Sequence, residues 1–161
     1  MNVNLKGGFF ARALNRRLVY LVLAALAAAA CVLFSGRERR TFVFFHDKDG
    51  LPRVEERMLR RTASREGDIV LYVEEACLGP ASPETTPLFE RGLRPDSVLL
   101  RGGTVYVALP EKAAVPAIAG RSVLKSLETL RSGILRNFPY VRGVRFFING
   151  REAYPGELRG G

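Results

Sequence analysis

An apolar run near the N-terminus constrains this chain more than any other feature of its sequence. Leu18–Phe34 contains 17 residues without a charge, with Arg16 and Arg17 directly before it and Arg37 shortly after it. A helix of this length approaches the roughly 30 Å of a bilayer's hydrocarbon core, and the run is longer than the apolar part of a secretory signal, about 7–15 residues. The run therefore predicts a membrane-targeting segment.

Three interpretations of this segment remain open. The arginines on both sides favour an uncleaved transmembrane anchor. Small residues stand before Cys31, which favours a lipoprotein signal with lipidation at Cys31, although the apolar run continues for three residues beyond it. The third interpretation is a buried core helix, which the basic flanks disfavour.

The charges around the segment predict its orientation. Residues 1–34 carry four Lys or Arg and no Asp or Glu, which accounts for four of the nine excess positive charges of the 161-residue chain. Glu38 partly offsets the arginines after the run, and the flank with the larger excess of Lys and Arg is retained in the cytoplasm. We therefore expect residues 1–17 to be a cytoplasmic tail and residues 18–34 to cross the bacterial inner membrane once. A domain over residues 40–155 then lies outside the cytoplasm, which argues against nucleic acid as a partner.

Basic residues also gather at the start of this outer region. Acidic neighbours balance most of them, and a solvated face is the simplest interpretation. Attraction to anionic headgroups or to a wall polymer such as peptidoglycan is the alternative. The basic residues are Arg37, Arg39, Arg40, Lys48, Arg53, Arg57, Arg60 and Arg61.

The first half of the outer region predicts a strand, a second element and a helix. Thr41–His46 is rich in β-prone residues and is followed by a turn over Asp47–Gly50. Arg53–Arg60 alternates weakly as a partner strand, and a helix there is the alternative. Ser64–Cys77 has apolar residues at helical spacing, stops at Gly79-Pro80, and places Cys77 on the buried face.

The second half predicts a loop, a hairpin, a helix and a strand. Ala81–Arg94 is proline-rich and is expected to be a loop outside the core and a contact surface. Ser97–Arg101 and Thr104–Leu109 flank two glycines, which is typical of a β-hairpin. Val123–Phe138 has a helical apolar stripe, and Val144–Ile148 is the last strand. These elements predict an α+β two-layer sandwich: a mixed or antiparallel sheet with two helices on one face, preceded by an N-terminal transmembrane helix.

The order and spacing of these segments resemble the GerMN domain, a module of GerM-type sporulation and germination proteins and of envelope lipoproteins. The resemblance covers about residues 40–152, although GerM-type proteins carry two copies and this chain has room for one. Leu109-Pro110 also replaces the Ser or Thr usual after the hairpin. The matching segments are Phe42–Gly50, Glu74–Pro80, Gly92–Leu99, Gly103–Leu109, Ser126–Leu130 and Phe138–Gly150.

The resemblance implies a non-catalytic, membrane-tethered module in the bacterial envelope or periplasm, acting in assembly through a protein partner. Sporulation or germination is implied by the family alone. GerMN domains are similar to ring-building motifs of secretion-type complexes, which contact partners through sheet edges and helices. A module that binds peptidoglycan or another anionic envelope ligand is the alternative function.

The sequence contains few residues that could form a catalytic site. His46 and Asp47 could form a dyad only with a serine brought close in the fold, for which Ser97, Ser122 and Ser126 are the candidates. Adjacent acids, Glu55 with Glu56 and Glu74 with Glu75, are expected to face opposite sides of their elements. We therefore expect no enzyme activity and no catalytic residue.

Metal and cofactor sites are equally unsupported. One histidine and two separated cysteines do not supply a zinc set. The pair Asp47 and Asp49 resembles the start of a calcium loop, but Met58 stands where the later acidic ligand belongs, so the pair is interpreted as part of a turn. No phosphate-binding glycine motif is present. We expect no metal and no cofactor.

Overall fold

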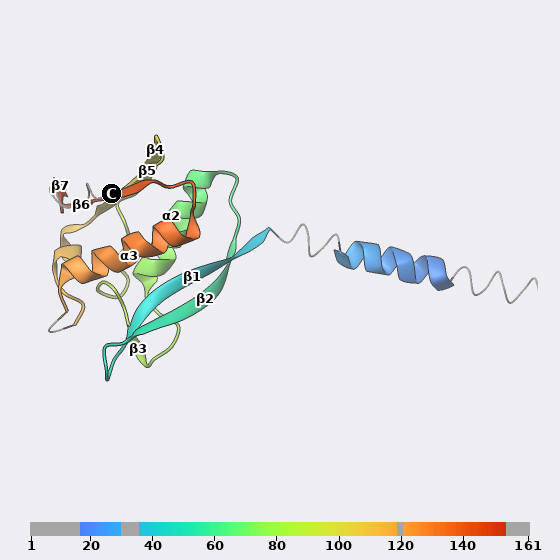
Figure 1. Ribbon diagram of the computed structural model, residues 1–161, viewed down its shortest axis with the longest axis horizontal. Coiled ribbons are helices and arrows are strands. Elements are labelled where there is room, and N and C mark those ends of the chain that lie inside the picture. The colour runs from blue at the N-terminus through green and yellow to red at the C-terminus, as the bar shows by residue number, and fades with distance from the viewer. Residues whose placement is uncertain (1–16, 30–35, 119–120, 154–161) are drawn as a thin grey trace, which may run out of the picture. The chain divides into compact units, whose positions relative to one another are not determined.

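The computed structural model describes residues 17–29, 36–118 and 121–153 (Figure 1). Residues 17–29 form a helix, and no helix within these ranges is both long enough and apolar enough to cross a bilayer. Residues 30–34 of the predicted anchor, including Cys31, lie outside the described residues. The membrane crossing and the lipidation of Cys31 therefore stay predictions. The described residues from Arg37 onward form one compact unit.

A long antiparallel hairpin begins this unit. β1 (Arg37–His46) pairs with β2 (Pro52–Arg60) along its length, with Arg37 opposite Arg60 and Phe45 opposite Pro52. The short β3 (Thr85–Thr86) pairs with the other edge of β1, but only at its end. The strand order is β2-β1-β3, so β2 is an edge strand. The ambiguous second segment is thus a strand and not a helix.

The two helices that the sequence predicts are present in the structure. α2 (Arg65–Leu78) begins at Ser64, whose hydroxyl accepts a hydrogen bond from the Gly67 N–H at 3.0 Å. α3 (Val123–Asn137) is capped in the same way by Ser122. A 3-10 turn, η1 (Glu111–Ala114), precedes α3.

The second sheet has four strands in the order β4-β5-β6-β7. The predicted hairpin is confirmed as β4 and β5, and β6 lies parallel to β5 because α3 carries the chain back across the sheet. The two-residue β7 pairs antiparallel with β6. The bounds are β4 (Ser97–Arg101), β5 (Thr104–Leu109), β6 (Gly143–Ile148) and β7 (Arg151–Glu152).

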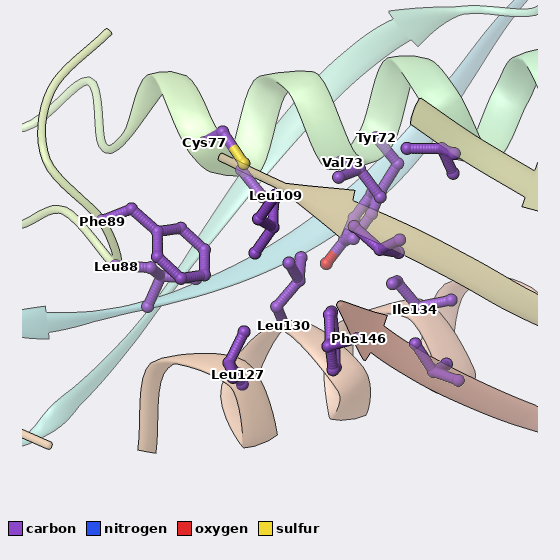
Figure 2. Packing of buried hydrophobic residues seen from close by; sticks show 14 of the residues in the cluster. Tyr72, Val73, Cys77, Leu88, Phe89, Leu109, Leu127, Leu130, Ile134 and Phe146 are labelled. Atoms are coloured by element: carbon purple, nitrogen blue, oxygen red, sulfur yellow. The ribbon is translucent and has the colours of Figure 1, made fainter. Parts of the chain in front are cut away.

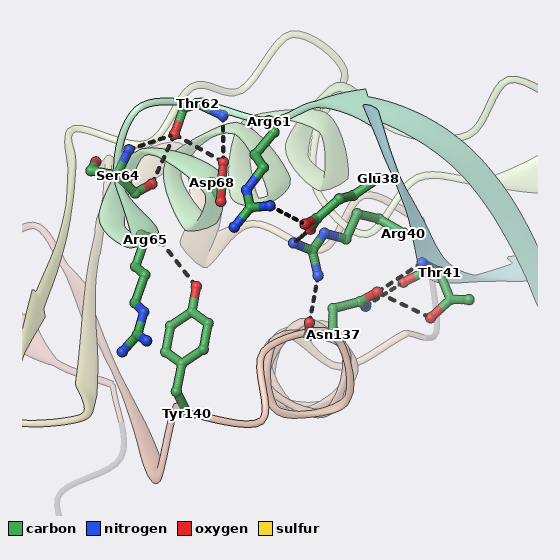
Figure 3. Close-up of polar contacts among 10 residues, drawn as sticks. All are labelled: Glu38, Arg40, Thr41, Arg61, Thr62, Ser64, Arg65, Asp68, Asn137 and Tyr140. Atoms are coloured by element: carbon green, nitrogen blue, oxygen red, sulfur yellow. Dashed lines mark hydrogen bonds and ion pairs between the residues drawn. The ribbon is translucent and has the colours of Figure 1, made fainter. Parts of the chain in front are cut away.

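The α+β class is confirmed, but the elements form two sheets, and the prediction of one sheet with both helices on one face is wrong in that respect. α2 and α3 contact each other, and each contacts both sheets. A side chain from the end of α3 occupies part of the free edge of β1. The Asn137 Oδ1 accepts from the Thr41 N–H at 2.9 Å, and the Asn137 Nδ2 donates to the Thr41 carbonyl at 2.8 Å (Figure 3). These two bonds occupy the groups that a neighbouring strand would use.

One continuous core lies between the helices and the two sheets (Figure 2). Tyr72 is near its centre: its ring stacks on Phe42 at 4.5 Å and meets the edge of Phe138 at 5.6 Å. Its hydroxyl donates to the Thr41 carbonyl at 3.0 Å. α2, α3 and β1 are therefore fixed to one another around this one side chain.

The proline-rich segment differs from its prediction. Leu88, Phe89 and Leu93 are buried in the core, and Thr85–Thr86 forms β3. The prolines prevent regular structure there, but apolar side chains between them still gain free energy by leaving water. The segment is therefore part of the core as well as of the surface.

Candidate functional site

A groove of about 520 Å³ lies beside the edge strand β2, and we call it the β2 groove. One wall comes from the hairpin and the other from the segment that leads from α2 to β3. The lining residues are Phe44 and His46 of β1, residues 53–56 of β2, and Ala81, Ser82, Glu84 and Thr85.

The end of α2 places the second wall. Gly79 has a φ of 93°, in the left-handed region where glycine is favoured, and a Cβ there would lie 3.0 Å from the Pro87 Cβ. Directly after this turn, the Ala81 N–H donates to both carboxylate oxygens of Glu55, at 3.3 and 3.2 Å. The Gly79 turn and the Glu55 carboxylate therefore hold the segment against β2.

An arginine with two carboxylates stabilises the same region. The Arg57 Nε lies 2.7 Å from Glu55 and its Nη1 lies 2.9 Å from Glu75, while its Nη2 donates to the Gly79 carbonyl at 2.6 Å. The guanidinium also lies 5.0 Å from the centre of the Phe42 ring, a cation–π distance. This cluster joins β2 to the C-terminal end of α2.

The prediction of a fully solvated basic face is wrong for two residues of the cluster. Arg57 is bound as described, and the side chain of Arg40 is only 14% exposed. The Arg40 guanidinium lies over the Phe138 ring at 4.3 Å. It also pairs with Glu38 and donates to the Asn137 carbonyl (Figure 3). Both arginines lose water because aromatic rings and carbonyl groups of other elements surround them.

The acidic pairs separate as the sequence predicts for β2. Glu55 binds Arg57, whereas Glu56 points to the other face and lies 3.3 Å from the exposed Arg39. The sequence did not indicate that Glu55 and Glu75 both bind Arg57. They lie on different elements, and no local spacing signals that contact; only the inward position of Arg57 in the β2 alternation hints at a partner.

His46 belongs to a turn. Its Nδ1 lies 3.1 Å from the Asp49 Oδ1 in an orientation that makes no hydrogen bond, and its Nε2 lies 3.8 Å from Asp47. Asp49 accepts a hydrogen bond from the Leu51 N–H at 2.9 Å, which holds the pKa of that carboxyl below its usual value. The interpretation of this segment as a turn is confirmed, although His46 also lines the β2 groove.

The serines suggested as nucleophiles have other places in the structure. Ser122 caps α3, Ser126 is buried within that helix, and Ser97 is exposed at the start of β4. Within residues 17–29, 36–118 and 121–153, no three His, Cys, Asp or Glu side chains gather as a metal site. None of these three serines is among the residues that line the β2 groove beside His46.

Cys77 is predicted to resist thiol reagents in the native state. It is fully buried in α2, and this burial raises the pKa of its thiol to about 12. Because the thiolate is the reactive species, we expect iodoacetamide at pH 8 to modify Cys77 only after the domain unfolds. Peptide mass mapping with and without denaturant checks this expectation, and rapid native labelling of Cys77 would contradict it.

No family model matches the sequence. An uncharacterized lipoprotein of Treponema pallidum (strain Nichols) is 28% identical over 98 residues, which cover 61% of this chain and 73% of that protein. Among solved structures, the first GerMN domain of the sporulation protein GerM from Bacillus subtilis has a TM-score of 0.51 at 17% identity, over 71% of this chain and 85% of that one.

The tandem GerMN domains of the same Bacillus subtilis protein give a TM-score of 0.54 at 17% identity. That alignment covers 73% of this chain and 41% of the tandem, so this chain spans less than half of its length. The unit that begins at Arg37 therefore has a GerMN-like fold.

Proposed function

We propose that this GerMN-like domain is a membrane-tethered interaction module outside the cytoplasm, which binds a protein of the bacterial envelope and catalyses no reaction. The β2 groove is the observation that carries the proposal. It lies beside an edge strand, its second wall is held by Glu55 and Gly79, and several of its polar side chains remain exposed. A groove of this kind suits recognition of another chain.

The location rests on the N-terminal segment and on the relative. The apolar run at residues 18–34 supports a tether, and a relative described as a lipoprotein supports an envelope location. A lipid on Cys31 and an uncleaved helix are both compatible with that tether. The intact mass of the protein extracted from membranes distinguishes them, because lipidation with cleavage removes about 30 residues and adds acyl chains.

Site-specific cross-linking in cells tests the interaction. A photoreactive amino acid at Ser82, in the groove, is compared with the same substitution at Ser97, which is exposed on β4 of the other sheet. We expect a discrete cross-linked envelope protein from position 82 and none from position 97. Equal products from both positions, or none from position 82 in a folded, membrane-bound protein, would contradict the proposal.

Binding to peptidoglycan is the second candidate, and exposed basic side chains such as Arg39 and Arg61 favour it. Both of these residues are ion-paired, and Arg40 and Arg57 are held inside the domain, so less free positive charge remains than the sequence indicates. Sedimentation of the protein with purified peptidoglycan at low salt, and its release at 0.5 M salt as screening predicts, would support this function.

A further inference from the structure

The backbone of β2 has hydrogen-bonding groups that face away from β1. In an antiparallel pair, residues alternate between facing the partner and facing outward. Thr41 directs both of its backbone groups toward Asn137, and Glu56 is the residue opposite it, so the backbone groups of Glu56 also face outward. By the same alternation, the backbone N–H and C=O of Val54 and Met58 face outward as well.

This edge is open, whereas the free edges of β1 and β4 are each bonded at one residue. Asn137 occupies the free edge of β1, and the Glu66 carboxylate accepts from the Leu100 N–H of β4 at 2.7 Å. In the described part of the chain, no group hydrogen-bonds to the outward backbone of β2. An open strand edge of this length is a template for another strand.

The exposed side chains along this edge indicate what would bind there. Val54 and Met58 are 62% and 57% exposed on the outer face of β2, on either side of Glu56. On the inner face, the β2 groove follows residues 53–56.

We propose that β2 binds an extended segment of the partner protein as an added strand, so that the first sheet gains a fourth strand. The inference rests on the proposed interaction function and specifies its mode. The bound segment has apolar side chains at alternate positions, which pack beside Val54 and Met58, and its backbone bonds to the outward groups of Val54, Glu56 and Met58.

A second copy of this chain fits the edge less well. The antiparallel self-pairing that aligns all three outward residues places Val54 opposite Met58, but it also places Glu56 opposite Glu56. Like charges directly opposite each other destabilise a strand pair. The partner of β2 is therefore a different segment.

Two variants of the full chain in detergent micelles test this mode of binding. Glu56→Pro removes one outward N–H that the fold does not use, and Glu56→Ala removes the same side chain but keeps the N–H. The probes are heptapeptides selected by display against the wild-type protein. We expect alternating apolar sequences whose affinity falls about tenfold for Glu56→Pro and stays near the wild-type value for Glu56→Ala.

Amide exchange supplies a readout that does not depend on the stability of the proline variant. In the free wild-type protein, the amides of Val54, Glu56 and Met58 should exchange faster than those of Glu55 and Arg57, and only the fast set should slow when the peptide binds.

Equal affinity of both variants, failure to select any peptide, or unchanged exchange of the fast set would overturn strand addition. A concentration-dependent dimer lost in Glu56→Pro would assign the edge to a second copy and also overturn it. Cross-linking at Ser82 without any change in the β2 amides would leave the interaction function standing and reject only this mode of binding.

Discussion

Replacing Arg57 with alanine is expected to lower the free energy of unfolding by about 2–4 kcal/mol, because two half-buried carboxylates lose their counter-charge. The Arg57 side chain is 17% exposed, and those of Glu55 and Glu75 are 22% and 28% exposed. Removing the guanidinium also frees the Gly79 carbonyl and ends the contact with the Phe42 ring. Urea unfolding followed by circular dichroism measures the change.

Arg39→Ala is the matched control for this prediction. It breaks an ion pair on the same hairpin, but Arg39 and Glu56 are 69% and 53% exposed, so water already screens their interaction. We expect a loss below about 1 kcal/mol. If both variants lose the same small amount, the Arg57 cluster does not hold β2 to α2 as described.

Gly133→Ala is expected to destabilise the domain by about 1–3 kcal/mol, although alanine favours a helix over glycine by about 1 kcal/mol. A Cβ at Gly133 would lie well inside van der Waals distance of the Tyr72 hydroxyl oxygen and 3.3 Å from the Tyr72 Cζ. The ring cannot retreat easily because it is held between Phe42 and Phe138. Thermal and urea unfolding measure the loss.

A double-mutant cycle with Tyr72→Phe isolates this contact. The single Tyr72→Phe variant loses the bond to the Thr41 carbonyl, which costs about 1 kcal/mol. In the double variant the clashing oxygen is absent. We therefore expect its loss of unfolding free energy to be smaller, by at least about 1 kcal/mol, than the sum of the losses of the two single variants. Additive losses would mean that Gly133 is needed for a reason other than its approach to Tyr72.

These two contacts join residues far apart in the sequence, whereas several elements of the fold follow from local sequence patterns. Side-chain periodicity and turn residues act within a few positions of the chain. They predict the strand at Thr41–His46, the β4–β5 hairpin and the helices α2 and α3. Gly133 interrupts the stripe of α3 without any local signal, because its requirement comes from Tyr72 on another helix. The burial of Leu88 and Phe89 was likewise not predicted, because the prolines around them indicate a loop outside the core.

At the candidate site, too, some features follow from the sequence and others only from the tertiary structure. The sequence favours a strand at residues 53–60 only weakly, with a helix as the alternative, and the structure establishes β2 and the side chains that point inward. It does not indicate that β2 lies at an edge, since strand order depends on long-range pairing. It also gives no sign that Arg57 binds Glu55 and Glu75 together, or that the segment after Gly79 forms a groove beside β2.

By itself, the sequence determines the apolar N-terminal run with its basic flanks, the α+β class and the resemblance to GerMN domains. Only the tertiary structure decides that the strands form two sheets and that β2 keeps an open edge. Both features depend on contacts between residues far apart in the sequence; the Asn137 amide, for example, bonds to the Thr41 backbone on the edge of β1 that faces away from β2. Local periodicity cannot encode a hydrogen bond across 96 residues, so the fold alone places it.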